Sequence, residues 1–319
     1  MVKKIVTIGG GNGQSVTIRA LKKFLPQIEI SSIVSVTDSG GSSGRLREKF
    51  NILPVGDILR VILALSSYPY LELRQIFYSN RFSSGELKDH NAGNLLLTFL
   101  YQESGSWSKA IEGLSEILKT QGRVFPVTLD LAHLCAELKN GEIIIGETNI
   151  DKPKFNYRVR KERLWLEPAA NLTAEAREEI LSADYIFLGS GDLYTSIIPN
   201  LLVGEIQDTL RNSKAKIIFI INLANRETGE TCGFKASDYV SEIHKYLPRQ
   251  VDFIIAQDPA FKPNLEHFAL KKWETVETDK GNWQDEDKAV LADLYSDDEA
   301  GMDWEKLAKP IGRILNLNF

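Results

Sequence analysis

KKIVTIGGGNG, residues 3–13, is a short β-branched run that breaks into glycines. Apolar residues at helical spacing follow it, at Val16, Ala20, Leu21 and Phe24. A strand, a glycine turn and a helix in this order open a βαβ unit. Because further predicted strands alternate with helices, we expect an α/β fold. The sheet should be Rossmann-like, doubly wound and mostly parallel, with helices on both faces.

The rest of the chain continues this alternation with one interruption. Between residues 123 and 167, short apolar runs and the Asn140-Gly141 hairpin signal predict a small antiparallel β insertion. We therefore predict a single Rossmann-like domain over residues 1–319 with this insertion. Strands are predicted at 28–36, 124–128, 131–138, 142–147, 157–166, 184–188, 215–221 and 251–256. Helices are predicted at 56–66, 71–78, 93–102, 107–119, 173–181, 201–210, 237–246 and 304–315, and an acidic loop region at 279–298.

Composition excludes several classes of protein. The 319 residues are 43% hydrophobic and 25% charged, which is typical of a globular chain with a large core. The net charge of −5 argues against nucleic acid as the main partner. Two cysteines, Cys135 and Cys232, give no disulfide framework, which favours a reducing compartment and a cytoplasmic location. No apolar stretch approaches the ~20 residues that span a bilayer, so membrane insertion is not expected.

The first glycine loop is a candidate phosphate site. In a parallel α/β sheet, ligands bind outside the carboxyl ends of the strands, and this loop follows the first strand. Glycine lets the backbone approach a ligand, and the next helix N-terminus favours an anion. The predicted ligand-binding residues are Gly10, Gly11, Asn12 and Gly13. The G-x-G-x-x-G pattern is incomplete at Gln14 and no Walker motif exists, so a tight structural turn is the alternative.

The second loop carries an acid and a run of small residues. Asp38 ends the second strand, where an acid can bond a ribose hydroxyl or ligate Mg²⁺, or can form an Asx turn. The following loop offers amides, hydroxyls and a guanidinium to a phosphate, and a surface loop is the alternative. The predicted binding residues here are Gly40, Gly41, Ser42, Ser43 and Arg45.

Two further segments complete the candidate catalytic and metal residues. Asp57 lies at the start of a predicted helix. Its side chain either caps this helix or binds a metal ion together with Asp38. His90 is a candidate general acid/base or phosphate contact, with a structural role as the alternative. Asn91 and Asn94 are predicted ligand contacts that are also good helix caps. The catalytic prediction is therefore Asp38, Asp57 and His90, and the metal prediction is Asp38 and Asp57.

A second glycine loop follows the strand at 184–188. It ends in hydroxyls that can bond phosphate at a helix start, although a capped turn is the alternative. A polar turn follows the strand at 215–221. Several such loops at one edge predict a site for a phosphorylated nucleotide or sugar-nucleotide. The predicted binding residues here are Gly189, Gly191, Asp192, Tyr194, Thr195, Ser196 and Asn222.

Six motifs taken in order resemble the CofD-like family. They are GGGxG at 9–13, DSGGSSGRL at 38–46, PxGD at 54–57, GNL at 93–95, GxGxLYTS at 189–196 and GET at 229–231. The family includes the bacterial YvcK-type gluconeogenesis factors and the 2-phospho-L-lactate transferases. The match runs from about residue 3 to about residue 251, and the C-terminal segment 257–319 diverges from it. The resemblance implies a Rossmann-like fold, a cytoplasmic location and often a homodimer.

The resemblance leaves two functions open. The triple glycine and the GGSSG run look more like the bacterial branch, which implies UDP-sugar binding and regulation of carbon metabolism, cell shape and wall synthesis. The transferase branch implies Mg²⁺-dependent movement of a phospholactyl group from a guanosine-activated donor to a deazaflavin hydroxyl. Whether the chain is an enzyme stays open; if it is, we expect a transferase of phosphorus-containing groups. A dinucleotide-dependent oxidoreductase is a third reading, disfavoured by the incomplete glycine fingerprint.

Overall fold

Seven parallel strands form the central sheet. The computed structural model describes residues 2–153, 159–283 and 286–318. The strand order is β12-β10-β8-β7-β1-β2-β3, and every neighbouring pair is parallel. This confirms the predicted α/β class with a mostly parallel sheet. The strands are β1 (Lys3–Gly9), β2 (Ile28–Val34), β3 (Arg123–Pro126), β7 (Tyr185–Leu188), β8 (Lys216–Ile220), β10 (Phe253–Gln257) and β12 (Ala289–Ala292).

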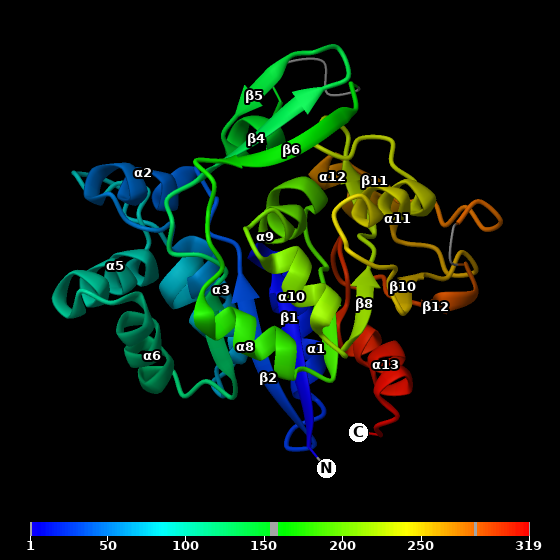
Figure 1. The fold of residues 1–319 in the computed structure, drawn as a ribbon, viewed down its shortest axis with the longest axis horizontal. Coiled ribbons are helices and arrows are strands. Elements are labelled where there is room, and N and C mark those ends of the chain that lie inside the picture. Colours follow the sequence, from blue (N-terminus) through cyan, green and yellow to red (C-terminus); the bar gives the residue numbers. More distant parts are fainter. Residues whose placement is uncertain (1, 154–158, 284–285, 319) are drawn as a thin grey trace.

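Helices cover both faces of this sheet, as Figure 1 shows. On one face α1 packs against α3 and α13, and on the other α8 packs against α10. The helices are α1 (Gly11–Lys22), α2 (Gly41–Phe50), α3 (Gly56–Leu65), α4 (Tyr70–Leu73), α5 (Ala92–Ser104), α6 (Trp107–Ile117), α7 (Glu147–Asp151), α8 (Ala174–Ser182), α9 (Ile198–Leu201), α10 (Ile206–Asn212), α11 (Ala236–His244), α12 (Leu265–Lys271) and α13 (Trp304–Leu315). Short π- or 3-10-helical turns are η1 (Arg74–Ser79), η2 (Leu193–Ile197) and η3 (Glu286–Lys288).

The core follows from the apolar strands. All four residues of β7 are buried, and α3 buries nine of its ten residues between the sheet and neighbouring helices. Strands that are covered on both faces need apolar side chains on both sides, which explains such continuous runs. The buried apolar residues form one cluster that extends from Ile5 on β1 to Leu315 on α13.

The antiparallel insertion is shorter than the predicted 123–167. β3 pairs in parallel with β2, so it belongs to the central sheet. The insertion proper is a three-stranded sheet in the order β5-β4-β6, from β4 (His133–Leu138) through β5 (Ile143–Ile145) to β6 (Lys161–Glu167). The predicted strand 142–147 ends at Ile145 because Gly146, with φ of +96°, turns the chain into α7. Residues 154–158, where the strand prediction for 157–166 begins, lie outside the described residues.

Figure 1 shows where the insertion lies: its sheet stands above the carboxyl ends of the parallel strands. The C-terminal segment also contributes to the sheet system. β12 lies within the predicted acidic loop region and forms an edge of the central sheet, while β11 (Trp273–Thr275) pairs antiparallel with β9 (Ala224–Arg226). Within the described residues, none of the helices is long and apolar enough to cross a bilayer.

Candidate functional site

Three helices begin at the carboxyl edge without a side-chain cap. The N-cap residues of α1, α2 and α3 are Gly10, Gly40 and Val55, and none provides a capping side chain. Some other helices are capped, because Asn91, Ser106 and Asp303 accept hydrogen bonds from the first turns of α5, α6 and α13, whereas the short helices α4, α7, α9 and α10 are not. Uncapped amides and the helix dipole attract negative charge, so the edge carries three sites of positive potential.

The N-termini of α1 and α3 meet at Asp57. A Cβ atom added at Gly10 would lie 2.4 Å from Asp57 Oδ2, and the Gly11 amide donates to this carboxylate. Arg60 Nη1 donates to Asp57 Oδ1 at 2.9 Å. Burial raises the pKa of Asp57 to about 6, against the lowering effect of Arg60. Asp57 is therefore a buried acid whose proton is exchangeable near neutral pH.

The N-termini of α2 and α3 meet at Gly56. A Cβ atom there would lie 2.4 Å from Ser43 Oγ and 3.5 Å from Asp38 Oδ2. Asp38 Oδ1 accepts a hydrogen bond from the Gly40 amide at 2.8 Å, which is the Asx turn foreseen from the sequence. The Asp38 charge also raises the pKa of Asp57, so the predicted metal pair shares one electrostatic environment.

The second glycine loop, which follows β7 at residues 189–196, packs directly on the first glycine loop at residues 10–13. A Cβ atom at Gly13 would lie 2.3 Å from the Ser190 carbonyl oxygen, and one at Gly191 would lie 3.6 Å from the Gly10 carbonyl oxygen. Its amides already have partners within the protein. Ser190 N donates to Thr17 Oγ1 at 3.0 Å, and Gly191 N donates to Asn222 Oδ1 at 3.0 Å. The amides that remain open to an anion therefore lie in the loops at residues 10–13 and 40–43 more than in the loop at 189–196.

The antiparallel insertion brings acids to the same edge. Glu147, at the start of α7, lies beside the second loop, where Ser39 N donates to Glu147 Oε2 at 3.4 Å. Burial and the Asp38 and Asp151 charges raise the pKa of Glu147 to about 8. Arg226 links the insertion to the second glycine loop, because it pairs with both Asp151 and Asp192.

A second buried glutamate lies behind the site. Glu230 Oε1 accepts a hydrogen bond from the Tyr194 amide at 2.8 Å, and burial raises the pKa of Glu230 to about 8. Lys161, from β6 of the insertion, donates through Nζ to the Glu230 carbonyl at 2.5 Å and lies over the Tyr194 ring. These contacts tie the insertion to the C-terminal half of the sheet.

The predicted histidine joins a hydroxyl and amide network. His90 Nδ1 and Ser42 Oγ lie 2.8 Å apart, and Asn94 Nδ2 donates to Ser42 Oγ at 3.1 Å. Asn91 Oδ1 accepts from the Asn94 amide at 2.7 Å, which is the capping role weighed from the sequence. Burial and nearby cations lower the pKa of His90, which favours the neutral imidazole. These hydrogen bonds hold the loop at residues 40–43 in place.

Most predicted residues gather at this edge, but some side chains point elsewhere. Arg45 is exposed and donates to the Lys88 carbonyl at 2.7 Å. The Tyr194 side chain is fully buried and packs edge-on against Phe234, and its backbone amide donates to Glu230. Asn12 is exposed at the start of α1, and Thr195 is buried while Ser196 approaches Gly10. The predicted set is thus brought together mainly through its backbone.

Several site residues were missed from the sequence. They are Arg60, Glu147, Asp151, Lys161, Arg226 and Glu230. One signal was available, because the tripeptide Gly-Glu-Thr occurs twice, at 146–148 and 229–231. Each copy contributes one acid whose pKa is raised, the partly buried Glu147 and the buried Glu230. The other residues lie far apart in the sequence and carry no local signature.

The acids can be tested against the Mg²⁺ that the resemblance implies. Within the described ranges, no group of three or more His, Cys, Asp or Glu side chains could hold a metal ion. Asp38 and Asp57 remain as two neighbouring carboxylates. Mg²⁺ is commonly held by one or two carboxylates together with waters and substrate phosphates, so this pair fits an ion that arrives with a phosphorylated ligand.

Comparison with known proteins assigns the family. The family model described as 2-phospho-L-lactate transferase CofD matches residues 5–295. The chain belongs to the CofD family. The six ordered sequence motifs and the glycine-lined edge are therefore features of a CofD-family protein, and the match extends through the C-terminal segment as far as residue 295.

Two similar proteins and one similar solved structure come from bacteria. A Thermotoga maritima protein is 40% identical over 299 residues, which is 92% of this chain and 90% of that protein. A Halalkalibacterium halodurans protein named gluconeogenesis factor is 36% identical over 282 residues, covering 87% of this chain and 85% of its own. The crystal structure of a Bacillus halodurans protein has a TM-score of 0.86 and 34% identity, covering 98% of this chain and 99% of that one.

Proposed function

We propose that this chain binds a nucleotide diphosphate of the UDP-sugar class and acts as a regulator of the gluconeogenesis-factor type. One observation carries the proposal: the uncapped N-termini of α1, α2 and α3 meet around Asp57 at the carboxyl edge of the sheet. A diphosphate is the anion that such converging helix ends bind well. The relatives named gluconeogenesis factor support the regulatory reading.

In this proposal, backbone amides bind the diphosphate. Asn12 and Gly13 of the first loop, and Gly41 to Ser43 of the second, offer their amides to the phosphates, while the Gly11 and Gly40 amides donate to Asp57 and Asp38. The second glycine loop packs against the first loop but does not offer its Ser190 and Gly191 amides, because these donate to Thr17 and Asn222. The sugar and base then lie toward the antiparallel insertion, which stands over this edge in Figure 1.

The acidic surroundings argue for Mg²⁺ in this binding. Several carboxylates influence one another at the edge, and the cations beside them include Arg60, Lys161 and Arg226. The carboxylates are those of Asp38, Asp57, Glu147, Asp151, Asp192 and Glu230. Two phosphates add further negative charge, which a divalent ion offsets. Asp38 and Asp57 are the residues that would hold Mg²⁺, which supplies charge neutralisation when it is bound. We also propose that the protein works in the cytoplasm as a homodimer, in carbon metabolism, cell shape and wall synthesis.

The transferase reading is the second candidate, and the acid pair favours it. In that reaction, a deazaflavin hydroxyl forms a bond to the phosphorus of the phospholactyl group as the bond to guanosine monophosphate breaks. Asp57, with its pKa of about 6, is suited to accept the hydroxyl proton near neutral pH. The description of the matching family model supports this reading.

Calorimetric titration separates the two. The protein is titrated with UDP-N-acetylglucosamine, UDP-glucose, GDP and a deazaflavin, each with and without Mg²⁺. Under the proposal, the UDP-sugars bind most tightly, Mg²⁺ strengthens them, and a deazaflavin adds nothing. Tight binding of GDP and deazaflavin together, with no response to UDP-sugars, would establish the transferase reading instead. If no nucleotide binds, both readings fail.

A further inference from the structure

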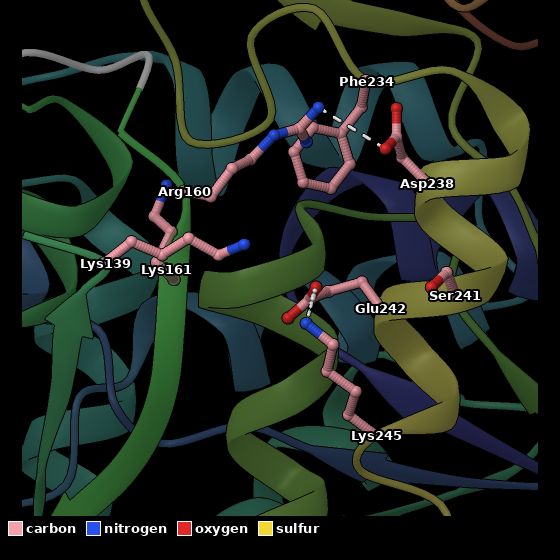
Figure 2. A pocket seen from close by; sticks show the side chains of 8 residues that line it. All are labelled: Lys139, Arg160, Lys161, Phe234, Asp238, Ser241, Glu242 and Lys245. Atoms are coloured by element: carbon pink, nitrogen blue, oxygen red, sulfur yellow. Dashed lines mark hydrogen bonds and ion pairs between the residues drawn. The ribbon is translucent and has the colours of Figure 1, made fainter.

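A separate cavity lies between the insertion and helix α11, as Figure 2 shows. It measures about 160 Å³ and includes none of the glycine-loop residues in its lining. This volume is below the roughly 300–1,000 Å³ of pockets for nucleotide- or drug-sized ligands. The cavity therefore suits a small metabolite.

Basic side chains dominate the lining. Lys139, Arg160, Lys161 and Lys245 face two acids, Asp238 and Glu242. Arg160 is paired with Asp238 at 3.4 Å, and Lys245 with Glu242 at 2.7 Å. The lining therefore has two more cations than acids, because Lys139 and Lys161 remain after the two ion pairs. Such a lining attracts an anion.

Lys161 is a buried residue in the lining of this cavity. Its residue is 3% exposed, and burial lowers the pKa of its amine. Among the described residues its amine donates to the Glu230 carbonyl and lies over the Tyr194 ring, and an ammonium group has three N–H donors, which leaves donor capacity for a ligand. Placing a lysine here costs desolvation free energy, which a bound anion would offset.

Glu242 adds a specific acceptor. The residue is 7% exposed, and its Oε2 accepts from Lys245. Its Oε1 is buried and has no hydrogen-bond partner in the part of the chain that the structure describes. A carboxylate oxygen accepts only, so a ligand hydroxyl can supply the missing donor if the Glu242 side chain turns toward the cavity. A ligand of this cavity should therefore carry both an anionic group and a hydroxyl.

We infer that this cavity binds a small phosphorylated polyol, whose phosphate contacts Lys139 and Lys161 and whose hydroxyl donates to Glu242 Oε1. Ser241, also in the lining, offers a second hydroxyl partner. This inference does not rest on the proposed nucleotide site, although Lys161 belongs to both sites. The two share a wall, because Lys161 also contacts Glu230 and the Tyr194 ring.

Titration calorimetry in a chloride buffer tests the inference on the whole chain. The probes are glycerol 3-phosphate, propyl phosphate, inorganic phosphate and glycerol. We expect glycerol 3-phosphate to bind at least about tenfold more tightly than propyl phosphate, which lacks hydroxyls, and glycerol not to bind. Lys139→Gln should weaken glycerol 3-phosphate by roughly tenfold, while Lys109→Gln on α6, also an exposed lysine, should not.

Three results would overturn the inference. They are no binding of either phosphate ester, equal affinity for glycerol 3-phosphate and propyl phosphate, or equal effects of the two lysine substitutions. A titration of each variant with UDP-N-acetylglucosamine keeps the two sites apart. A change in phosphate-ester binding with unchanged nucleotide binding supports a separate cavity site, whatever becomes of the nucleotide proposal.

Discussion

The Asp57 carboxylate lies directly against the Gly10 backbone, where an added Cβ atom would come within 2.4 Å of Asp57 Oδ2. Asp57 cannot retreat easily, because its other oxygen is held by Arg60 at 2.9 Å. The contact joins the first glycine loop to the start of α3. It makes the glycine at this position a requirement of the site rather than of the turn, since the Gly10 φ of −171° is open to any residue.

Replacing Gly10 with alanine should therefore damage the site. Gly10→Ala should displace the Asp57 carboxylate and weaken nucleotide binding by at least about tenfold, with a stability loss of about 1–3 kcal/mol. Gly9→Ala is the matched control, because its Cβ would meet Gln14 at an ordinary 3.5 Å. Calorimetry and thermal melts measure both effects. Equal behaviour of the two variants would refute the assigned role of the Gly10–Asp57 contact.

The stability of the protein should depend on pH through Glu147. Its pKa rises from 4.5 to about 8 on folding, so the folded state holds a proton that the unfolded state releases. The free energy of unfolding of the native protein should then fall as pH rises from about 4.5 to 8. Glu147→Gln should remove the part of this fall that Glu147 causes and leave the parts caused by Asp57 and Glu230, whose pKa values burial also raises.

The variant should be more stable than the native protein by about 2 kcal/mol at pH 9, discounted for partial solvent screening, and indistinguishable at pH 4. Urea denaturation across this range measures the difference. Glu103→Gln, on an exposed part of α5, is the control and should leave the pH dependence unaltered. A pH-independent difference between Glu147→Gln and the native protein would contradict the buried-acid account.

Asn91 should contribute to stability as a helix cap. Its Oδ1 accepts from the Asn94 amide at 2.7 Å, and the residue is fully buried. Asn91→Ala should lower the free energy of unfolding by about 1–2 kcal/mol, whereas Asn91→Ser should retain most of it because serine also caps well. Denaturation curves of the two variants decide this. Loss of ligand binding without loss of stability would instead favour the predicted ligand contact.

The acid pair should determine the response to Mg²⁺. Asp38→Asn and Asp57→Asn should each reduce the gain in nucleotide affinity that Mg²⁺ gives, by roughly tenfold, because one carboxylate ligand is lost. Asp208→Asn removes an exposed acid paired with Arg211 and should change nothing. Titrations with and without Mg²⁺ measure the gain. An undiminished gain in both site variants would remove Asp38 and Asp57 as the metal residues.

Local signals predicted much of the fold. The strand and glycine turn that open the chain are found as β1 and the start of α1, and the predicted helix 304–315 has the bounds of α13. These elements are decided by residue spacing over one or two turns. β12 was missed because its four residues lie in an acidic stretch, where only pairing with β10 makes them a strand.

The sequence by itself determined the family motifs, the parallel α/β order and the placing of glycine loops at the carboxyl edge, because each depends on residues that are close together in the sequence. Only the tertiary structure decided that Glu147 and Lys161 of the insertion join that edge, where Arg226 of β9 pairs with Asp151, since these segments are far apart in the sequence. It also decided which amides stay open, as Thr17 and Asn222 take those of the second glycine loop. Hydrogen-bond partners and buried charges depend on three-dimensional packing, and no local pattern specifies them.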